Sequence, residues 1–522
     1  MQTPKRPILR TACVVLAAVA AVACSGQSPA GMSPEFQAGS QPGFQADSGA
    51  GEAEMTLQEA FGGTLGGGRA WDDIGPAEIA RSSAAYAWLT SVATPTEIAP
   101  LIAAGVGGTV LNYSVFVEAT GAIELFSLLV PDSDPSVPRP LLTAFHGAGT
   151  SHGDIYFRAM DFFIEADQRD WFLIAPLQRN LNGPPDTSYA SAASQLHVEA
   201  VIELVLDTYA IDRDRLYAAG FSMGGGNAMS YAARHRDRRS GAISAVVNHT
   251  GTLALANVYE NAPVIQMDIL EGIFGGPPAG PVFEWQRSSL LEMDAAGALL
   301  PQGRHMAVNL GSVPVQSWFN TSDIFDYLQN QSITIDSFIS ALPGGSHELI
   351  MVPGGVPDCV EQHCWASLDI PAACQWLSTQ SLNASPSSGT VLVDRDSRWA
   401  RFDVAQRQSG AFTGFEFSVD TSANLVRIEE TENALQVSVR VQKLGLTLSQ
   451  PLFLSTGNFE AAGNEVVLRG FSSAPVSVSR NGAPLGATCG GAANVNGWCY
   501  DAQAGSVTIR ESSQLNATWR IQ

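Results

Sequence analysis

Short apolar runs alternate with amphipathic stretches between about residues 110 and 380. The runs have the length of buried strands, and the stretches between them repeat their apolar residues at helical spacing. Such alternation indicates a mostly parallel sheet that is covered by helices on both faces. The first two runs are joined by a short turn at Thr120-Gly121, which predicts an antiparallel hairpin at the sheet edge. The predicted strands are VLNYSVFVEA (110–119), AIELFSLLV (122–130), LLTAF (141–145), WFLIAP (171–176), LYAAG (216–220), AISAVV (242–247), VPVQSWF (313–319) and ELIMV (348–352).

One long segment interrupts this alternation. Residues 251–310 contain no clear strand–helix unit, and they hold the breaker-rich run FGGPPAGP (274–281). An insertion at this point of an α/β sheet is where a cover over an active site would lie, so we interpret it as a lid. The simpler interpretation is an insertion without a role. Residues 54–105 read as helical with Gly-rich interruptions and suggest no function.

The period of the pattern changes after about residue 385. Short runs of alternating apolar and polar residues, such as LQVSVRVQ and SVTIRE, are separated by turn residues. This pattern predicts an all-β, sandwich-like domain over residues 385–522, after a catalytic domain over 54–384. We see no catalytic signature in the β domain. It either binds substrate or supports the fold.

The first 53 residues read as a targeting segment and a tether. Three basic residues precede an apolar run at 11–23, which is too short to span a bilayer, and the run ends at Ala23 directly before Cys24. Small residues followed by Cys resemble a bacterial lipobox, so residues 1–24 are expected to be a lipoprotein signal with Cys24 as the lipidated residue. Ser25 after it resembles an outer-membrane lipoprotein. Plain secretion is the alternative. Residues 25–53 are rich in Gly, Ser, Pro and Gln and predict a flexible linker.

The net charge of the chain argues against polyanionic partners. The chain carries 50 acidic and 28 basic residues, for a formal charge of −22. Such a surface repels nucleic acids and other polyanions, so no nucleic-acid partner is expected, whereas a neutral substrate meets no such barrier. Contact with a membrane is expected only through the lipid anchor, and the oligomeric state stays open. Acidity that serves solubility alone is the simpler interpretation.

The strongest chemical signal is the run Gly220-Phe221-Ser222-Met223-Gly224. It follows a predicted strand and opens a predicted helix, which is the context that a nucleophilic serine on a sharp turn requires. Large side chains have no room two positions before and after that serine, and glycine stands at both. The N–H of Met223 would then be one donor to an oxyanion. The arrangement resembles the nucleophile elbow of the α/β-hydrolase fold, with Ser222 as nucleophile.

A second turn supplies the other oxyanion donor. His146-Gly147-Ala148-Gly149 follows the LLTAF strand directly, and we expect the N–H of Ala148 to act there. His146 itself is interpreted as structural, because the base of an α/β-hydrolase follows the nucleophile in the chain.

The order Ser, acid, His places the other two catalytic residues. Asp323 follows the next-to-last strand and is the expected acid, with Asp326 as the weaker candidate. His363 stands between the last strand and the closing helix (369–380) and is the expected base. The rival is His347. It comes only 24 residues after Asp323, which leaves little room for a helix and a strand, and choosing it would leave the ELIMV run outside the sheet.

The cysteines and the other histidines bear on disulfide formation and on metal binding. Five of the seven cysteines follow the leader region, and export would place them in an oxidising compartment. Cys489 and Cys499 predict a local bridge. Among Cys359, Cys364 and Cys374 one is left over, and a bridge from either of the first two to Cys374 would fix the loop around His363. The remaining histidines show no metal-ligand spacing and no phosphate-binding or dinucleotide motif occurs, so no metal and no cofactor are implied.

The stretches YAIDRDRLYAAGFSMGGGNAMSYAARH (209–235) and PDSDPSVPRPLLTAFHGAG (131–149) resemble the extracellular polyhydroxybutyrate depolymerase and feruloyl esterase family over about residues 125–380. Ser222, Asp323 and His363 match its nucleophile, acid and base, although FNTSD stands where HGxxD is usual. The resemblance implies a secreted serine hydrolase of carboxylic esters or polyesters. The alternatives are a peptidase of the prolyl-oligopeptidase type and a non-catalytic, surface-binding lipoprotein.

Overall fold

The computed structural model describes residues 90–92, 99–117, 119–134, 136–178, 188–357, 359, 361–383, 386–460, 462–490, 495–512 and 514–522. The predicted leader, Cys24 and the predicted linker at 25–53 lie outside these residues. Within the described part, no helix combines the length and the apolar character that crossing a membrane requires.

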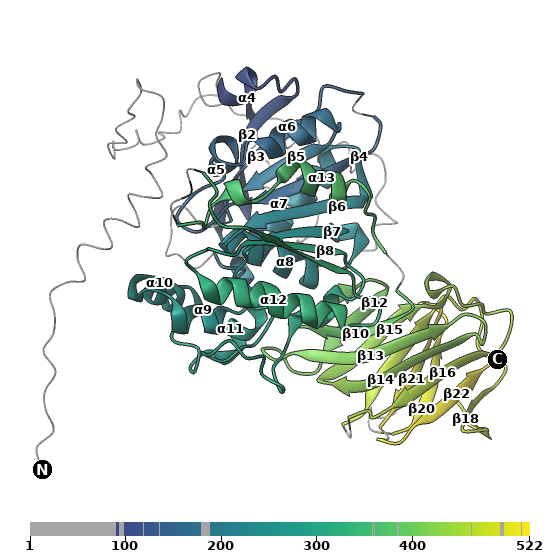
Figure 1. The fold of residues 1–522 in the computed structure, drawn as a ribbon. Coiled ribbons are helices and arrows are strands. Elements are labelled where there is room, and N and C mark those ends of the chain that lie inside the picture. Colours follow the sequence, from purple (N-terminus) through teal and green to yellow (C-terminus); the bar gives the residue numbers. More distant parts are fainter. Residues whose placement is uncertain are drawn as a thin grey trace, which may run out of the picture. The chain divides into compact units, whose positions relative to one another are not determined.

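A nine-stranded sheet forms the first part of the described chain, in the order β1-β2-β3-β5-β4-β6-β7-β8-β9 (Figure 1). Strands β1 to β3 and the β3–β5 pair run antiparallel, and the pairs from β5 to β9 are parallel. From β2 onward this is the strand order of the α/β-hydrolase fold, which confirms the predicted class. The strands are β1 (Thr90–Val92), β2 (Thr109–Val117), β3 (Ala122–Val130), β4 (Arg139–Phe145), β5 (Phe172–Pro176), β6 (Ile211–Phe221), β7 (Ala245–His249), β8 (Val315–Asn320) and β9 (His347–Val352).

Two local predictions differ from the structure. The stretch that includes Thr90–Val92 reads as helical in the sequence, but these residues form β1 and pair with Leu111, Asn112 and Tyr113 of β2. The predicted hairpin of β2 and β3 is present, but β1 lies outside it and forms the sheet edge. An edge strand of three residues is stabilised by its partner's backbone rather than by its own pattern, which is why the sequence does not signal it.

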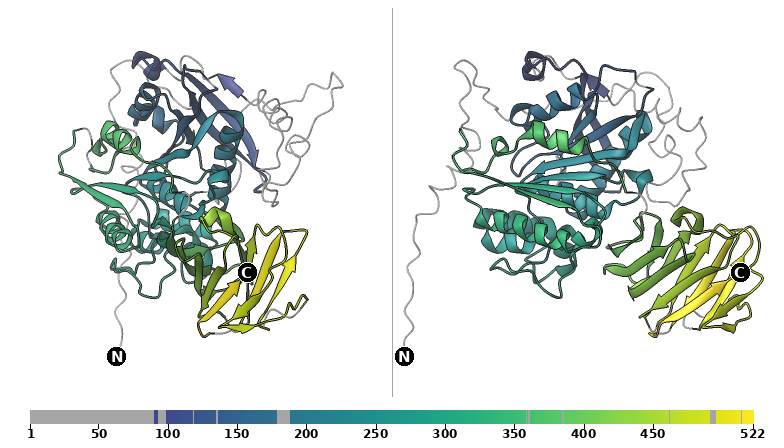
Figure 2. Two further views of the ribbon diagram at one scale, coloured as in Figure 1. Left: turned by 90° about the vertical axis from the view of Figure 1, so that its right-hand side faces the viewer. Right: turned by 45° about the vertical axis from the view of Figure 1, so that its right-hand side comes forward.

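Helices cover both faces of this sheet (Figure 2). On one face, apolar residues of α7, α8 and α12 share a hydrophobic cluster with the strands, including Val201, Met229 and Ile335. On the other face, α6 and α13 contribute Phe162 and Ile370 to a second cluster. The helices are α4 (Ala99–Ala103), α5 (Asp154–Phe157), α6 (Asp161–Gln168), α7 (Ala192–Thr208), α8 (Met223–Arg234), α12 (Asp326–Ser340) and α13 (Ile370–Leu377).

The connection from β7 to β8 is helical. It contains α9 (Leu255–Asn261), α10 (Val264–Phe274), α11 (Val282–Ser288) and the 3-10 turn η3 (Met306–Leu310). We call α9 to α11 the cap helices. Their apolar residues, Leu270 and Trp285 among them, form a separate small cluster that also includes Met223 of α8. The cap helices therefore pack beside the residue that follows Ser222.

The last part of the described chain forms two further sheets, in the orders β10-β13-β14-β16-β22-β18-β19 and β11-β12-β15-β17-β21-β20. Residues of both sheets share one apolar core, which confirms the predicted C-terminal sandwich-like fold. The strands are β10 (Ser388–Val393), β11 (Ser397–Trp399), β12 (Phe402–Gln406), β13 (Thr413–Asp420), β14 (Leu425–Glu432), β15 (Ala434–Arg440), β16 (Leu452–Gly457), β17 (Asn464–Arg469), β18 (Val478–Arg480), β19 (Ala483–Pro484), β20 (Gly497–Asp501), β21 (Ser506–Glu511) and β22 (Ala517–Ile521).

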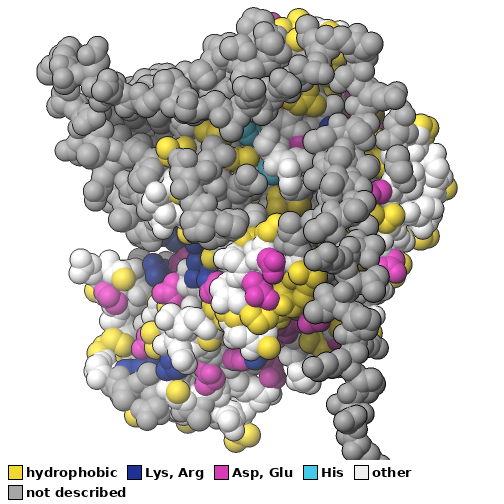
Figure 3. Space-filling view, turned by 90° about the vertical axis from the view of Figure 1, so that its left-hand side faces the viewer, with side chains coloured by type: hydrophobic (Ala, Val, Ile, Leu, Met, Phe, Trp, Pro, Cys, Tyr) yellow, Lys and Arg dark blue, Asp and Glu magenta, His cyan; other side chains and the backbone are white. Residues whose placement is uncertain are grey.

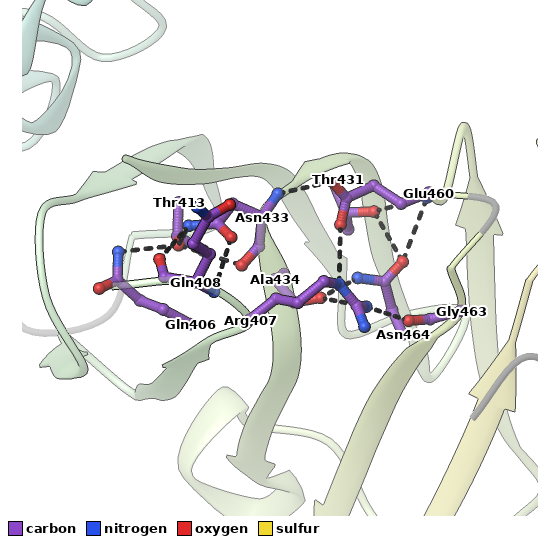
Figure 4. A network of polar contacts seen from close by, with 10 residues as sticks. All are labelled: Gln406, Arg407, Gln408, Thr413, Thr431, Asn433, Ala434, Glu460, Gly463 and Asn464. Atoms are coloured by element: carbon purple, nitrogen blue, oxygen red, sulfur yellow. Dashed lines mark hydrogen bonds and ion pairs between the residues drawn. The ribbon is translucent and has the colours of Figure 1, made fainter. Parts of the chain in front are cut away.

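A polar network ties these two sheets together at the turn between β14 and β15 (Figure 4). Thr431 of β14 donates to the side-chain oxygen of Asn464 in β17 at 3.1 Å, and the N–H of Glu460 bonds to both side chains. The carboxylate of Glu460 accepts from the N–H of Asn433 at 2.8 Å. Because these groups satisfy one another, we interpret the network as structural.

Candidate active site

Ser222 stands at the point where β6 ends and α8 begins. Its backbone has φ 55° and ψ −120°, a conformation that residues other than glycine rarely adopt. Backbone hydrogen bonds hold it there: its N–H donates to the carbonyl of His249 at 2.9 Å, and its carbonyl accepts from Thr252 at 3.1 Å. Such strain persists only where the surroundings impose it, and a strand-to-helix elbow that exposes a nucleophile is one such place.

The two glycines around Ser222 are required by backbone packing. A Cβ at Gly220 would overlap the carbonyl of Gly224. A Cβ at Gly224 would overlap the carbonyl oxygens of Phe145 and His146 at the end of β4. The glycines therefore let the nucleophile turn lie directly against the loop that carries Ala148.

Ser222, His363 and Asp323 lie in one hydrogen-bonded line, although 141 residues separate the first from the second. The Oγ of Ser222 is 3.0 Å from Nε2 of His363, and Nδ1 of His363 is 2.7 Å from Oδ2 of Asp323. A carboxylate only accepts hydrogen bonds, so Nδ1 carries a proton and a neutral ring leaves Nε2 free to accept from Ser222. This is the tautomer that a general base needs.

Burial and aromatic rings hold this line in place. The side chain of Asp323 is 1% exposed and that of His363 is 11% exposed. The imidazole lies between Phe221, with ring centroids 4.6 Å apart, and Phe325, whose ring meets it edge-on at 4.8 Å. These rings restrict the movement of His363 and exclude water from two of its sides.

The structure separates the two candidate acids. Oδ1 of Asp323 accepts from the N–H of Phe325 at 2.9 Å, which orients Oδ2 toward His363. Asp326 is exposed and opens α12, where a carboxylate favours the helix N-terminus. Asp323 is thus the one that the structure brings to His363.

His347 belongs to a different set. It begins β9, and its Nε2 lies 3.0 Å from Oγ of Ser317 in β8 while its Nδ1 lies 2.7 Å from Asp336 on α12. Ser317 is fully buried and accepts a further bond from Asn248 at 3.0 Å. Burial lowers the pKa of His347, and Asp336 opposes that shift. The same three residue types thus occur twice, but this second set joins β8, β9 and α12 and does not include Ser222.

The two expected oxyanion donors lie on elements that meet at Ser222. Met223 is the first residue of α8, so its N–H has no acceptor within the helix. Ala148 is exposed in the loop after β4. His146 is buried, with its two ring nitrogens each 2.8 Å from a backbone carbonyl oxygen, of Gly147 and Leu177. That position agrees with the structural interpretation of His146.

His249, which no sequence motif indicated, is fully buried at the end of β7. Its Nε2 lies 2.9 Å from Oγ of Ser367, which itself donates to the carbonyl of Cys364, so Nε2 carries the proton. Burial and the nearby His363 lower the pKa of His249 to about 3. A neutral His249 therefore anchors the loop after His363 without adding charge beside it. In the sequence, the available signal was its place at the end of the strand that follows the one leading into Ser222.

The disulfide around the base is a correction to the sequence analysis. Cys359 pairs with Cys364, and neither pairs with Cys374. Cys374 is a free, buried thiol inside α13, where it packs in the hydrophobic cluster beneath the sheet and where burial raises its pKa. The bridge therefore closes a short loop that contains His363. The expected bridge between Cys489 and Cys499 is present.

The cap helices present an apolar surface. On α10, Val264 is 72% exposed and Ile269 is 41% exposed, with the exposed carboxylate of Asp268 beside them. Figure 3, which views the face that carries α10, shows hydrophobic side chains interspersed with acidic ones. Beneath α10, Gln266 donates to the hydroxyl of the buried Tyr189 at 2.9 Å. The cap is thus attached to the scaffold by apolar packing and by at least this polar contact.

Comparisons with known proteins add the following. No protein-family model matches the chain, and no curated protein matches it. Among solved structures it is similar to a ferulic acid esterase, with a TM-score of 0.37 and 15% identity over 52% of this chain and 98% of the esterase. It is also similar to an S-formylglutathione hydrolase from Agrobacterium tumefaciens, with a TM-score of 0.40 and 16% identity over 52% and 96% of the two chains. A vibralactone cyclase has a TM-score of 0.39 and 16% identity, over 59% and 91%. Membership of the polyhydroxybutyrate depolymerase and feruloyl esterase family therefore stays a prediction.

Proposed function

We propose that this chain is an exported serine hydrolase of carboxylic esters, with Ser222 as nucleophile, His363 as general base and Asp323 as the acid that orients the base. One observation carries the proposal: Ser222 stands on a strained strand-to-helix turn, and its Oγ is in hydrogen-bond contact with an imidazole that is itself held by a buried carboxylate. A serine that is merely exposed to solvent, or one that only caps a helix, needs neither the imidazole nor the carboxylate.

The arrangement supports acyl transfer in two steps. His363 takes the proton of Ser222 as Oγ attacks the ester carbonyl, and the resulting imidazolium is stabilised by Asp323. The N–H groups of Met223 and Ala148 stabilise the charge on the carbonyl oxygen. His363 returns its proton to the leaving alcohol, and it then activates the water that hydrolyses the acyl-enzyme. All these groups belong to the chain, so the mechanism needs no cofactor.

The net charge supports the proposed class of substrate, and the disulfides support the proposed export. A net charge of −22 favours neutral esters or polyesters over polyanionic substrates. Two disulfides in the described residues suit an oxidising compartment, in agreement with the predicted leader and the predicted lipid anchor at Cys24. We further propose that the cap helices contact the substrate, because they pack against Met223.

The test is hydrolysis of p-nitrophenyl acetate, butyrate and octanoate by the chain without residues 1–24. Wild type should hydrolyse at least one ester, and Ser222→Ala should lose at least about 10⁴-fold in kcat. Ser378→Ala, which removes an exposed serine hydroxyl near the end of α13, is the matched control and should behave as wild type. A folded wild-type protein that cleaves none of these esters would overturn the esterase proposal, and chromogenic proline peptides would then test the peptidase alternative.

A further inference from the structure

Gln362, the residue directly before His363, has a strained backbone. Its φ is 54°, in the left-handed region that favours glycine. A glutamine in this conformation is retained only where its side chain or its surroundings impose it. Neither the fold nor the three proposed catalytic groups requires a long amide at this position, so its contacts call for a separate explanation.

The side-chain amide of Gln362 is fully engaged. Its Oε1 accepts hydrogen bonds from Nδ2 of Asn320 and from the backbone N–H groups of Gly355 and Val356, each at 2.9 Å. Its Nε2 donates to the carbonyl oxygens of Val356, at 3.2 Å, and Cys359. The backbone partners fix which end is oxygen and which is nitrogen, because an N–H only donates and a carbonyl only accepts.

These bonds join the loop of the base to the loop of the acid. Asn320 is the buried last residue of β8, and its own carbonyl accepts from the N–H of Asp323 at 3.1 Å. A second link runs from the N–H of Ile324 to the carbonyl of Glu361 at 3.2 Å. The two loops that carry Asp323 and His363 are therefore held together by two links besides the bond between the two side chains.

We propose that Gln362 is a positioning residue, whose amide holds His363 at hydrogen-bond distance from both Asp323 and Ser222. The proposal rests on the proposed function of His363. It identifies a role for a side chain that touches neither substrate nor reacting atoms, and it acts through the geometry of the base alone.

The chemistry of the amide suggests variants that separate this role from folding. Gln362→Gly removes all five bonds but fits the backbone better, because glycine adopts positive φ without strain. Gln362→Glu keeps the length and the acceptor but places a carboxylate oxygen against two carbonyls. Gln375→Ala is the matched control: it removes an exposed amide on α13 whose Oε1 accepts from Arg169 at 3.3 Å.

The first readout is ester hydrolysis by the full mature chain. Gln362→Gly and Gln362→Glu should lower kcat about 10- to 100-fold, as expected for a misplaced base, with KM changed less than about twofold. The pH profile of kcat should shift as well, since the base no longer has its carboxylate partner. Gln375→Ala should match wild type. Wild-type kcat and an unchanged pH profile in Gln362→Gly would overturn the proposal.

The second readout does not depend on activity. A histidine Nδ1–H held by a carboxylate gives a low-field proton NMR resonance. Wild type should show one from His363 beside one from His347, which Asp336 holds in the same way, and the resonance of His363 is the one that His363→Ala lacks. Gln362→Gly should lose or broaden that resonance while remaining folded. Retention of the resonance in Gln362→Gly would overturn the inference even if wild type hydrolysed no ester, whereas an inactive wild type with the expected NMR result would count against the proposed function alone.

Discussion

At the scale of single residues, the two histidines after Asp323 show how one side chain type takes two roles. His363 is partly exposed and faces a serine on a strained turn, whereas His347 is buried and faces Ser317 in the middle of a strand. Only the first of the two imidazoles is accessible to solvent. The difference is decided by exposure and by the backbone of the serine, because the hydrogen-bond distances of the two sets are nearly the same.

We therefore predict different outcomes for the two alanine variants. His363→Ala should lose at least about 10³-fold in kcat with little change in stability. His347→Ala should keep the chemistry but lose about 1–3 kcal/mol in the free energy of unfolding, because Ser317 and Asp336 lose a buried partner. Ester kinetics and urea denaturation of both variants check this. Full activity in His363→Ala together with none in a folded His347→Ala would assign the base to His347.

At the scale of elements, all candidate groups lie where strands of the sheet end. Ser222 follows β6, Asp323 follows β8, Ala148 follows β4 and His363 lies after β9. Because β4, β6, β7, β8 and β9 are parallel, their carboxyl ends meet at one edge, which is where α/β sheets place their sites. The loop after β9 is the longest of these connections, and it is the one that carries a disulfide.

The disulfide in that loop leads to a prediction about activity. Reduction of Cys359–Cys364 by dithiothreitol, which is itself oxidised to its cyclic disulfide, should lower kcat about tenfold because the short loop around His363 gains freedom. Reoxidation should restore it. The variant Cys489→Ser/Cys499→Ser should respond in the same way as wild type, since its missing bridge lies in the β sheets. Equal kcat before and after complete reduction, verified by thiol counting, would contradict the prediction.

Helix α7 carries a second element-scale prediction. Burial, reinforced by Glu199 and Asp207 on the same helix and opposed by Arg213 and Arg395, raises the pKa of Glu203 to about 8. The folded state then holds a proton that the unfolded state has lost, so stability falls as pH rises from about 4.5 to about 8.

Replacing the carboxyl of Glu203 tests the predicted direction of this pH dependence. Glu203→Gln should match wild type in the free energy of unfolding near pH 5 and exceed it by about 1–2 kcal/mol at pH 9, less than full burial would predict because the side chain is only partly buried. Urea denaturation at both pH values measures this. A variant that is less stable than wild type at pH 9 would show that Glu203 is favourably ionised.

At the scale of the whole molecule, the C-terminal sheets share structure with the hydrolase part. Leu392 of β10 and Phe412 belong to the hydrophobic cluster of the nine-stranded sheet, and Asn309 exchanges two hydrogen bonds with the backbone of Leu392. The aromatic side chains of the described β region are buried or partly buried, so none forms an exposed stacking platform. From these contacts we predict that this region supports the fold of the nine-stranded sheet.

A buried ion pair at this junction provides the test. Oδ2 of Asp394 accepts from Arg234, at the end of α8, and from Arg287 of α11, at 2.6 Å in each case. Burial opposes ionisation of Asp394, but the two guanidinium groups outweigh it and hold its pKa at about 2. This contribution to stability is present above pH 4 and is lost as the pH falls toward 2.

Asp394→Asn should therefore lower the free energy of unfolding by about 3 kcal/mol at pH 7, since it leaves the buried Arg234 without its counter-charge, whereas the partly buried Arg287 keeps Glu284 at 3.4 Å. Glu416→Gln, which changes an exposed carboxylate of β13, is the control and should change it by less than about 0.5 kcal/mol. Tryptophan fluorescence during urea unfolding measures both. An unchanged midpoint in Asp394→Asn would mean that the pair contributes no net stability.

The local pattern of the sequence determined most strands and the elbow at Ser222, because hydrophobic periodicity and the glycines around that serine act within a few residues. It did not determine the edge strand β1 or the cap helices. Chain order added Asp323 and His363 as expectations. The pairing of Cys359 with Cys364, the engagement of His347 by Ser317 and Asp336, and the roles of His249 and Gln362 depended on tertiary structure. Most of those contacts join residues from different strands and loops, and no pattern along the chain records which distant groups the sheet will bring together.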